Sequence, residues 1–404
     1  MDISSPDTTR SNVNLSQAEA NANNIVLWEL NSQTDGDIGY ILNRGQINRQ
    51  RNALSMQISH MSDGRWAIVT GNGYNSPNNS TGLIIAYLDA SGGTPSYKKV
   101  MINGVQGGLS TPTVVDTDFD GIVDYAYAGD LNGNLWRFDL RGNSNSWSAF
   151  KLFQAKVPGQ NIAQPITTAP AVTYHCSQPG YIILFGTGKY FETSDNGTTV
   201  QNSVYGIWDK LDSTLVLSSN LVQQSIVSKA GAVTSNTPAA SFLLQSNNTV
   251  DWAGGKMGWR YDLLSTSSRI VVPPYVVNDI LYFNEVKPVF PACGEGQLVT
   301  AFQAVQSCTG QQPNHGVFDT NFDGVVDNND LITFNGQATY ASGVQLPYSI
   351  NNLVDASIWI SPKALQCSTP PCPTIQTGLS DPIGVNLINT PPKRASWRQI
   401  TQQQ

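Results

Sequence analysis

The segment 110–129 reads STPTVVDTDFDGIVDYAYAG, in which an acidic loop separates two apolar runs. Similar pairs of runs occur before it, at 54–59 and 66–71, and after it, at 168–173 and 181–186. The glycines that end the three copies, Gly71, Gly129 and Gly186, are 58 and 57 residues apart. The runs alternate in polarity and are rich in β-branched residues, which is typical of strands rather than helices. A repeat of this length built from antiparallel strands predicts the blades of a β-propeller.

The residues that follow each glycine support the same architecture. Each glycine precedes a loop and a further strand that ends in an aromatic residue or leucine and then aspartate, as at Phe138-Asp139. A fourth, looser unit pairs the runs 274–277 and 280–283 through a tight Asn278-Asp279 turn, and its return strand is 298–302. These four units predict an all-β fold.

The acidic loop of the second repeat has the spacing of a calcium site. Its aspartates occupy positions 1, 3, 5 and 9, and position 6 is a glycine, which permits the positive φ that turns the chain. Calcium prefers about six to eight oxygen ligands, and carboxylates this close together would repel one another without a cation. The alternative is an Asp/Gly-rich surface turn, which is common. The predicted ligands of this calcium loop, 116–124, are the side chains of Asp116, Asp118, Asp120 and Asp124 and the carbonyl of Ile122.

The position of this loop indicates what the ion would do. The loop lies at the hairpin turn of its unit, whereas the fourth unit closes the equivalent hairpin with Asn278-Asp279 alone. The loop is therefore an insertion into a scaffold that other units close without metal. We expect calcium to act there as a local clip and a functional switch, and not as a requirement for folding of the whole domain.

A second loop, at 319–330, repeats the pattern and adds an acid at position 12. It is expected to be an inserted, dockerin-like loop, and the apolar run 331–334 after it is expected to begin a short helix. The alternative is again a polar loop without an ion. Its predicted ligands are Asp319, Asn321, Asp323 and Asp330, the carbonyl of Val325, and Asp327 through a water molecule.

Composition limits the class of protein. Of the 404 residues 13% are charged, and the net charge of −7 without any Lys/Arg cluster argues against nucleic-acid binding. No apolar run approaches the length of a membrane-spanning helix. The start of the chain lacks the apolar core of a signal peptide, so we expect a fragment of a longer extracytoplasmic protein. We expect a propeller domain over 25–404, with an N-terminal extension or linker, or the first strand, at 1–24.

The five cysteines suggest an oxidising compartment. Cys293 and Cys308 flank a short loop, and Cys367 and Cys372 enclose a proline-rich segment, so each couple is expected to form a local disulfide. Zinc is the competing interpretation, but neither couple has Cys-x-x-Cys spacing and the chain has only three histidines. Cys176 is left over, either free or with a partner outside this chain.

The chain resembles the C-terminal domain of the PilY/PilC family, the type IV pilus biogenesis factors and tip adhesins. The resemblance is carried by the segment 108–139, which contains the first calcium loop and the run DLNGNLWRFD. Further matching segments are 27–30, 37–40, 66–75, 185–190 and 394–398. The family's N-terminal region, which often contains a von Willebrand A-type domain, has no counterpart in this sequence.

The resemblance implies a fold and a function. It implies a modified seven-bladed, quinoprotein-like β-propeller with calcium-loop insertions, secreted or periplasmic and located at the cell surface, at a pilus tip or fimbrium. Calcium at 116–124 would regulate pilus extension against retraction and support surface attachment and twitching motility. The implied partners are the type IV pilus machinery, minor pilins and a host-cell surface receptor, with no enzymatic activity.

Two other classes of function are open to this sequence. An extracellular calcium-dependent propeller that binds carbohydrate or matrix would also have calcium loops and many aromatic residues. A quinone-dependent dehydrogenase is disfavoured, because its site needs a central calcium held by separated Glu, Asn and Asp and a disulfide between adjacent cysteines. The chain has no adjacent cysteines, and the acids of its first loop lie within one hairpin.

Overall fold

A computed structural model describes most of the chain between residues 28 and 350. The described ranges are 28–42, 53–54, 58–89, 95–231, 241–289, 297–321, 326–334 and 336–350, with short strands at 359–360, 374–376 and 383–384. Within these ranges the regular structure consists of strands and of 3-10 turns at Thr193–Gly197 (η2), Ser218–Asn220 (η3) and Asn328–Asp330 (η4). No helix in this part of the chain is long and apolar enough to span a membrane. The expected extension at 1–24 lies outside the described residues.

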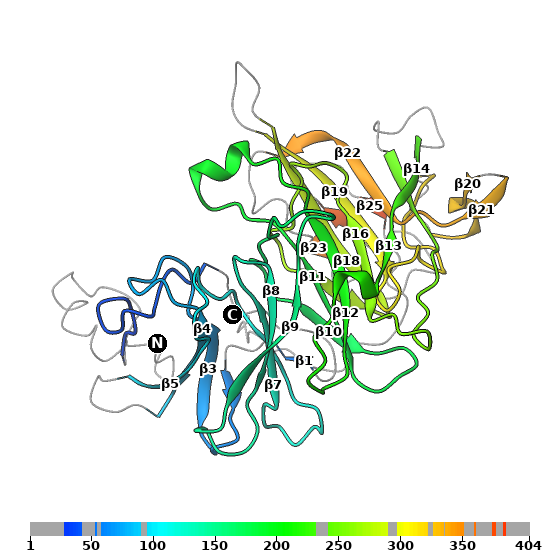
Figure 1. The fold of residues 1–404 in the computed structure, drawn as a ribbon. Helices are drawn as coiled ribbons and strands as arrows, with labels where there is room; N and C mark the ends of the chain where they lie inside the picture. The colour runs from blue at the N-terminus through cyan, green and yellow to red at the C-terminus, as the bar shows by residue number, and fades with distance from the viewer. Residues whose placement is uncertain are drawn as a thin grey trace, which may run out of the picture.

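The first two sheets lie side by side and come from the N-terminal half of the chain (Figure 1). The first sheet has the order β2 (Ile58–His60), β3 (Trp66–Gly71), β4 (Gly82–Tyr87) and β5 (Ser96–Met101). The second has the order β1 (Ala53–Leu54), β6 (Thr113–Val115), β7 (Tyr125–Gly129), β8 (Asn134–Asp139) and β9 (Ser148–Gln154). All neighbouring strands in both sheets are antiparallel.

Two larger sheets continue the series. The third has the order β10 (Ala171–Tyr174), β11 (Tyr181–Gly186), β12 (Ser203–Asp209), β16 (Gly258–Asp262) and β13 (Leu221–Gln224). The fourth has the order β14 (Ile226–Gly231), β15 (Ser241–Gln245), β22 (Gly343–Ile350), β19 (Gln297–Gln306), β18 (Ile280–Val289) and β17 (Tyr275–Val277). Smaller sheets pair β20 (Ile332–Phe334) with β21 (Gln337–Thr339), and β24 (Thr374–Gln376) with both β23 (Trp359–Ile360) and β25 (Ile383–Gly384). Neighbouring strands in the third and fourth sheets are antiparallel except β13 and β16, which are parallel. Successive, mainly antiparallel sheets of this kind are typical of the blades of a propeller.

Three of the strands predicted from the repeat are confirmed. The predicted runs 66–71, 125–129 and 181–186 coincide with β3, β7 and β11. The tight turn between β17 and β18 is also confirmed, because Asn278 and Asp279 have φ angles of 48° and 63°. Two positive φ values in succession define the type of two-residue turn that suits the twist of a hairpin.

The predicted strand at 54–59 differs from the structure. Its start belongs to β1, which pairs with β6 in the second sheet, with Leu54 opposite Val114. Its end belongs to β2, which pairs with β3 in the first sheet, with His60 opposite Trp66. The chain therefore contributes to two sheets within a few residues. A run of apolar residues does not show this change of sheet, because the pairing partners lie far away in the sequence.

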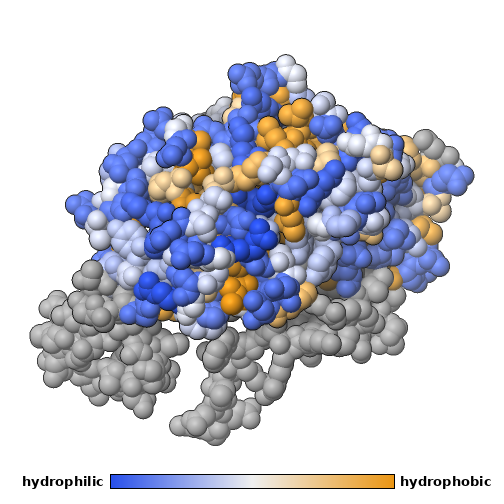
Figure 2. All heavy atoms as spheres, turned by 60° about the horizontal axis from the view of Figure 1, so that its bottom comes forward, coloured by the Kyte–Doolittle hydropathy of each residue, from blue (hydrophilic) through white to orange (hydrophobic). Residues whose placement is uncertain are grey.

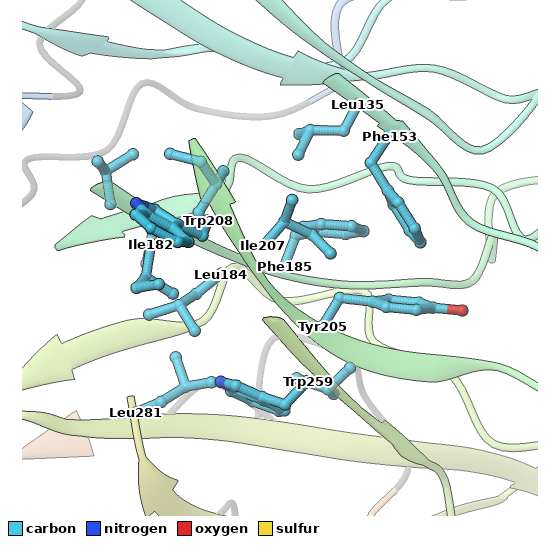
Figure 3. Packing of buried hydrophobic residues seen from close by; sticks show 14 of the residues in the cluster. Leu135, Phe153, Ile182, Leu184, Phe185, Tyr205, Ile207, Trp208, Trp259 and Leu281 are labelled. Atoms are coloured by element: carbon cyan, nitrogen blue, oxygen red, sulfur yellow. The ribbon is translucent and has the colours of Figure 1, made fainter. Parts of the chain in front are cut away.

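Hydrophobic side chains fill the spaces between successive sheets. Leu135 and Phe153 of the second sheet meet side chains of the third, and the rings of Phe153 and Tyr205 are 5.2 Å apart (Figure 3). Trp259 of the third sheet and Leu281 of the fourth belong to the same cluster and are fully buried. Burial of each such side chain contributes about 1.5 to 3 kcal/mol, so the packing between sheets contributes strongly to stability.

One face of the molecule is mostly polar (Figure 2). Figure 2 shows one face on which hydrophilic residues predominate and hydrophobic patches are separate and small. Among the described residues, the exposed large hydrophobic side chains include Trp66, Phe119 and Tyr174, which lie in different parts of the chain. Single exposed side chains of this kind are normal for a protein surface.

The disulfide predicted between Cys293 and Cys308 is wrong. Cys308 is bonded to Cys176, 132 residues away, and their Cα atoms are 6.0 Å apart. Cys176 follows β10 of the third sheet and Cys308 follows β19 of the fourth, so the packing of these sheets brings the two together. Cys293, and the predicted Cys367–Cys372 pair, lie outside the described residues.

Candidate metal centre

The first acidic loop connects β6 to β7, at the hairpin where the repeat places it. One carboxylate oxygen from each of Asp116, Asp118 and Asp120 lies within 4.8 Å of the other two. Asp116 is half-buried, and the other two are exposed. Three of the four predicted carboxylates therefore converge on one small region that solvent can reach.

Backbone hydrogen bonds curl the loop around these carboxylates. The Asp116 carboxylate accepts from the amides of Phe119 at 2.7 Å and Gly121 at 2.9 Å. Asp120 accepts from the amide of Ile122 at 2.7 Å. Gly121 has a φ of 87° with open space where a side chain would start, as a sharp turn at this position requires. The local sequence thus builds the turn with its acidic groups already gathered.

Asp124 has a different environment. Its Oδ2 accepts a 2.8 Å hydrogen bond from the amide of Thr117 and a second, short one from the Thr117 hydroxyl. The Asp124 carboxylate lies outside the group formed by the other three carboxylates. Its hydrogen bonds to Thr117 join the end of the loop to its start. Its backbone amide donates to the carbonyl of Val115 at 2.9 Å, which continues the pairing of β6 with β7.

This donor set fits calcium. The gathered ligands are carboxylate oxygens, which suit a hard cation and do not suit a soft one. The residues that would hold the ion are Asp116, Asp118 and Asp120, with the carbonyl of Ile122 and Asp124 as the remaining predicted ligands. The ion would supply positive charge that offsets the repulsion among the carboxylates.

The second loop is partly described. Asp319, Asn321, Asp327 and Asp330 lie within the described residues, whereas Asp323 and Val325 lie outside them. The buried Asp330 carboxylate accepts from the amides of Thr320 at 2.6 Å, Asn321 at 3.2 Å and Asp327 at 2.8 Å. Asp330 therefore braces the backbone of the loop, and the calcium ligands of this loop stay a prediction.

The helix predicted after this loop is wrong. Ile332 starts the strand β20, which pairs with β21 so that Ile332 lies opposite Thr339. Phe318 and Ile332, on either side of the loop, are buried in one cluster with Phe302 of the fourth sheet. The β-branched residues after Asp330 favour a strand, and this packing selects it.

The structure brings together a third group of potential metal ligands, which the sequence did not indicate. One ring nitrogen of His175 lies within 4.8 Å of the sulfur atoms of Cys176 and Cys308. The two sulfur atoms are bonded to each other, so they are not thiolate ligands. The sequence carried no signal for this group, because Cys308 is 132 residues from Cys176.

His175 is held as a neutral side chain. Its Nδ1 accepts from the amides of Ser177 at 3.1 Å and Gln178 at 2.9 Å, so the ring proton is placed on Nε2. The ring packs against Trp208 and Trp252, with centroid distances of 4.6 and 4.3 Å. Protonation of Nδ1 would point a new N–H at the two backbone amides that donate to it, and would place a positive charge in an apolar environment. Burial accordingly lowers the pKa of His175 to about 4.

We expect His175 to make folding sensitive to mild acid. Folding lowers the pKa of His175 from 6.5 to about 4, so the unfolded state binds more protons than the folded state between about pH 6.5 and 4. The stabilisation is complete above this window and is lost as the pH falls through it. As the pH falls from 6.5 to 5, the free energy of unfolding of the wild type should decrease more steeply than that of His175→Gln. The difference between the two slopes should be about 1 kcal/mol per pH unit. Urea unfolding at several pH values measures this, and equal slopes would contradict it.

Comparisons with known proteins agree with this fold. A family model described as the PilY1 beta-propeller domain matches residues 10–230. The crystal structure of the Pseudomonas aeruginosa PilY1 C-terminal domain superposes with a TM-score of 0.71 at 27% sequence identity. That match covers 89% of this chain and 74% of the other.

Curated relatives carry the same description. Type IV pilus biogenesis factor PilY1 of Pseudomonas aeruginosa strain PAO1 is 31% identical over 362 residues, which covers 80% of this chain and 30% of that protein. A PilY1 homolog of Xylella fastidiosa is 36% identical over 248 residues, or 56% of this chain and 15% of the homolog. The chain thus spans less than a third of the length of these relatives.

Proposed function

The chain belongs to the PilY1 β-propeller family, and from this premise we propose that it is a calcium-binding domain of a type IV pilus biogenesis factor. The observation that carries the calcium part is the convergence of the Asp116, Asp118 and Asp120 carboxylates within a loop shaped by their own hydrogen bonds. In this proposal, calcium occupancy of the loop regulates pilus extension against retraction, and so surface attachment and twitching motility.

The rest of the proposal concerns the setting of the domain. The described sheets form part of a seven-bladed ring in a secreted or cell-surface protein at the pilus tip. Its partners are the pilus machinery, minor pilins and a host-cell surface receptor, and it acts by binding rather than by catalysis. The relatives are named as pilus biogenesis factors, which supports a role in the pilus system.

We expect Asp120→Ala to abolish calcium binding at the first loop and to leave the fold intact. Calcium at a hundredfold excess over its dissociation constant contributes about 2.7 kcal/mol, which is small for a domain of several packed sheets. Isothermal titration calorimetry should show the loss of one site, and circular dichroism should be unchanged. Asp124→Ala is expected to behave in the same way, because it removes a predicted ligand and the link to Thr117.

Asp212→Ala is a matched control for this experiment. Asp212 also accepts a hydrogen bond from an amide two residues later, that of Thr214 at 2.8 Å, and lies outside the loop. Its replacement should leave calcium binding unchanged. If Asp120→Ala kept the calcium stoichiometry of the wild type, the ligand assignment would be wrong. In a piliated host, loss of binding without any change in piliation or twitching would reduce calcium to a structural clip.

A further inference from the structure

The end of the first loop is bonded to the neighbouring sheet as well as to its own. The amide of Val123 donates to the carbonyl of His60 at 2.9 Å, and His60 forms a parallel bridge with Ile122. His60 belongs to β2, whose other edge pairs with β3 of the first sheet. The last residues of the loop therefore extend the first sheet by one short bridge. A loop that served only its own hairpin would not make this contact.

A second connection runs through the turn between β8 and β9. The amide of Leu140 donates to the carbonyl of Asp124 at 2.8 Å. The hydroxyl of Ser62, in the turn after β2, lies 2.5 Å from the carbonyl of Leu140 and 2.7 Å from that of Gly142. The same hydroxyl oxygen accepts a 3.2 Å hydrogen bond from the indole of Trp147. The loop, the β8–β9 turn and the β2–β3 turn thus form one closed set of contacts.

These connections are buried, although the acids of the loop are not. Met61, Val123, Leu140 and Trp147 are buried members of one hydrophobic cluster between the first and second sheets. Close packing of this kind moves as a unit, so displacement of Val123 would disturb Met61 and the turn that contains it. The carboxylates of Asp118 and its neighbours face solvent at the other end of the same short segment.

We propose that the segment 116–124 is an ion-operated clasp between the first and second sheets. The inference rests on the proposed calcium binding and adds what the ion controls. Without calcium, repulsion among the gathered carboxylates favours opening of the loop, and opening releases the Val123–His60 hydrogen bond. With calcium, the loop is held closed and the turn at 60–62 is held with it. The exposed Trp66, whose ring stacks on His60 at 5.1 Å, then lies on a surface that depends on the ion.

Amide hydrogen exchange tests the clasp directly. At a hundredfold excess of calcium over its dissociation constant, any opening that requires ion release should be about 100-fold rarer than in chelator. Exchange in the peptide 58–66 should then slow together with exchange in 116–124. The strand β18, in the fourth sheet, should be unaffected and serves as an internal reference. Asp120→Ala should abolish the calcium effect in both peptides.

Ser62→Ala tests the reverse direction of the coupling. Linkage requires that a weaker clasp also lowers the affinity for calcium, although Ser62 touches no predicted ligand. Loss of this hydrogen bond should weaken calcium binding by about three- to tenfold in calorimetry. Ser342→Ala is the matched control, because its hydroxyl also donates to a backbone carbonyl, that of Leu243 at 3.0 Å in the fourth sheet, outside the clasp. It should leave the affinity for calcium unchanged.

The outcomes separate the clasp from the calcium site itself. If calcium binds and slows exchange only within 116–124, the clasp is overturned and the calcium site stands. Wild-type affinity in Ser62→Ala would likewise overturn the clasp alone. If the wild-type protein binds no calcium at the first loop, the proposed function fails, and the clasp fails with it. The clasp would be established if calcium slows exchange at 58–66 and Ser62→Ala binds calcium more weakly than the wild type.

Discussion

Removal of the Cys176–Cys308 disulfide is expected to lower the free energy of unfolding by about 4 to 5 kcal/mol. The bond closes a loop with a sequence separation of 132 residues, and in the chain-entropy model a loop of this size restricts the unfolded chain by about that amount. The bond also joins the third and fourth sheets at the ends of β10 and β19. Urea unfolding of the double Cys176→Ser, Cys308→Ser variant measures the effect.

Two controls make this prediction specific. Reduction of the wild-type protein should lower its stability at least as far as the double variant, because reduction breaks the same bond together with any Cys367–Cys372 bond. Cys293→Ser should retain the Cys176–Cys308 crosslink in non-reducing peptide mapping. A crosslink between Cys293 and Cys308 in the wild type would contradict the pairing, and so would a double variant as stable as the wild type.

Most of the fold could be predicted because its signals are local. The strands at 66–71, 125–129 and 181–186 and the Asn278-Asp279 turn depend on neighbouring residues, and the structure confirms them. The resemblance to the C-terminal domain of the PilY/PilC family is confirmed as well. The number of blades stays a prediction, because it depends on closure of the whole ring and not on one repeat.

The errors share a physical cause. Cys308 pairs across two sheets, Ile332 joins a strand because it packs on the fourth sheet, and the run 54–59 divides between two sheets. Each outcome is decided by contacts between residues far apart in the sequence. A short segment read alone favours the nearest partner, which here was wrong.

The candidate site shows the same division. The spacing of Asp116, Asp118 and Asp120 is local, and their carboxylates converge as the spacing predicts. The engagement of Asp124 with Thr117 depends on the closed shape of the loop and was not predicted. The bond from Val123 to His60 links different sheets, so no pattern within the loop could indicate it. The calcium ion itself stays a prediction.

Asp209→Ala is expected to destabilise the protein by about 3 to 5 kcal/mol, because it leaves a buried charge without its partner. Asp209 of the third sheet and Arg137 of the second form an ion pair at 2.6 Å, and their side chains are 1% and 9% exposed. The Tyr127 hydroxyl donates to the same carboxylate at 2.8 Å. Arg137 also donates to the carbonyl of Asp212 at 2.8 Å and lies over the rings of Tyr125 and Phe150, but these contacts supply no negative charge to replace the carboxylate.

The exposed pair of Asp139 and Arg141 provides the comparison that decides the argument. Its side chains are 36% and 54% exposed and its N–O distance is 2.7 Å, so it has similar geometry in a different environment. Water screens such a pair, and Asp139→Ala should cost less than about 1 kcal/mol. Urea unfolding of both variants measures the difference. Equal losses would show that burial between the second and third sheets does not set the strength of the Arg137–Asp209 pair. If Asp209→Ala destabilises the protein only slightly, and adding Arg137→Met restores the stability of the wild type, apolar packing can replace the ion pair.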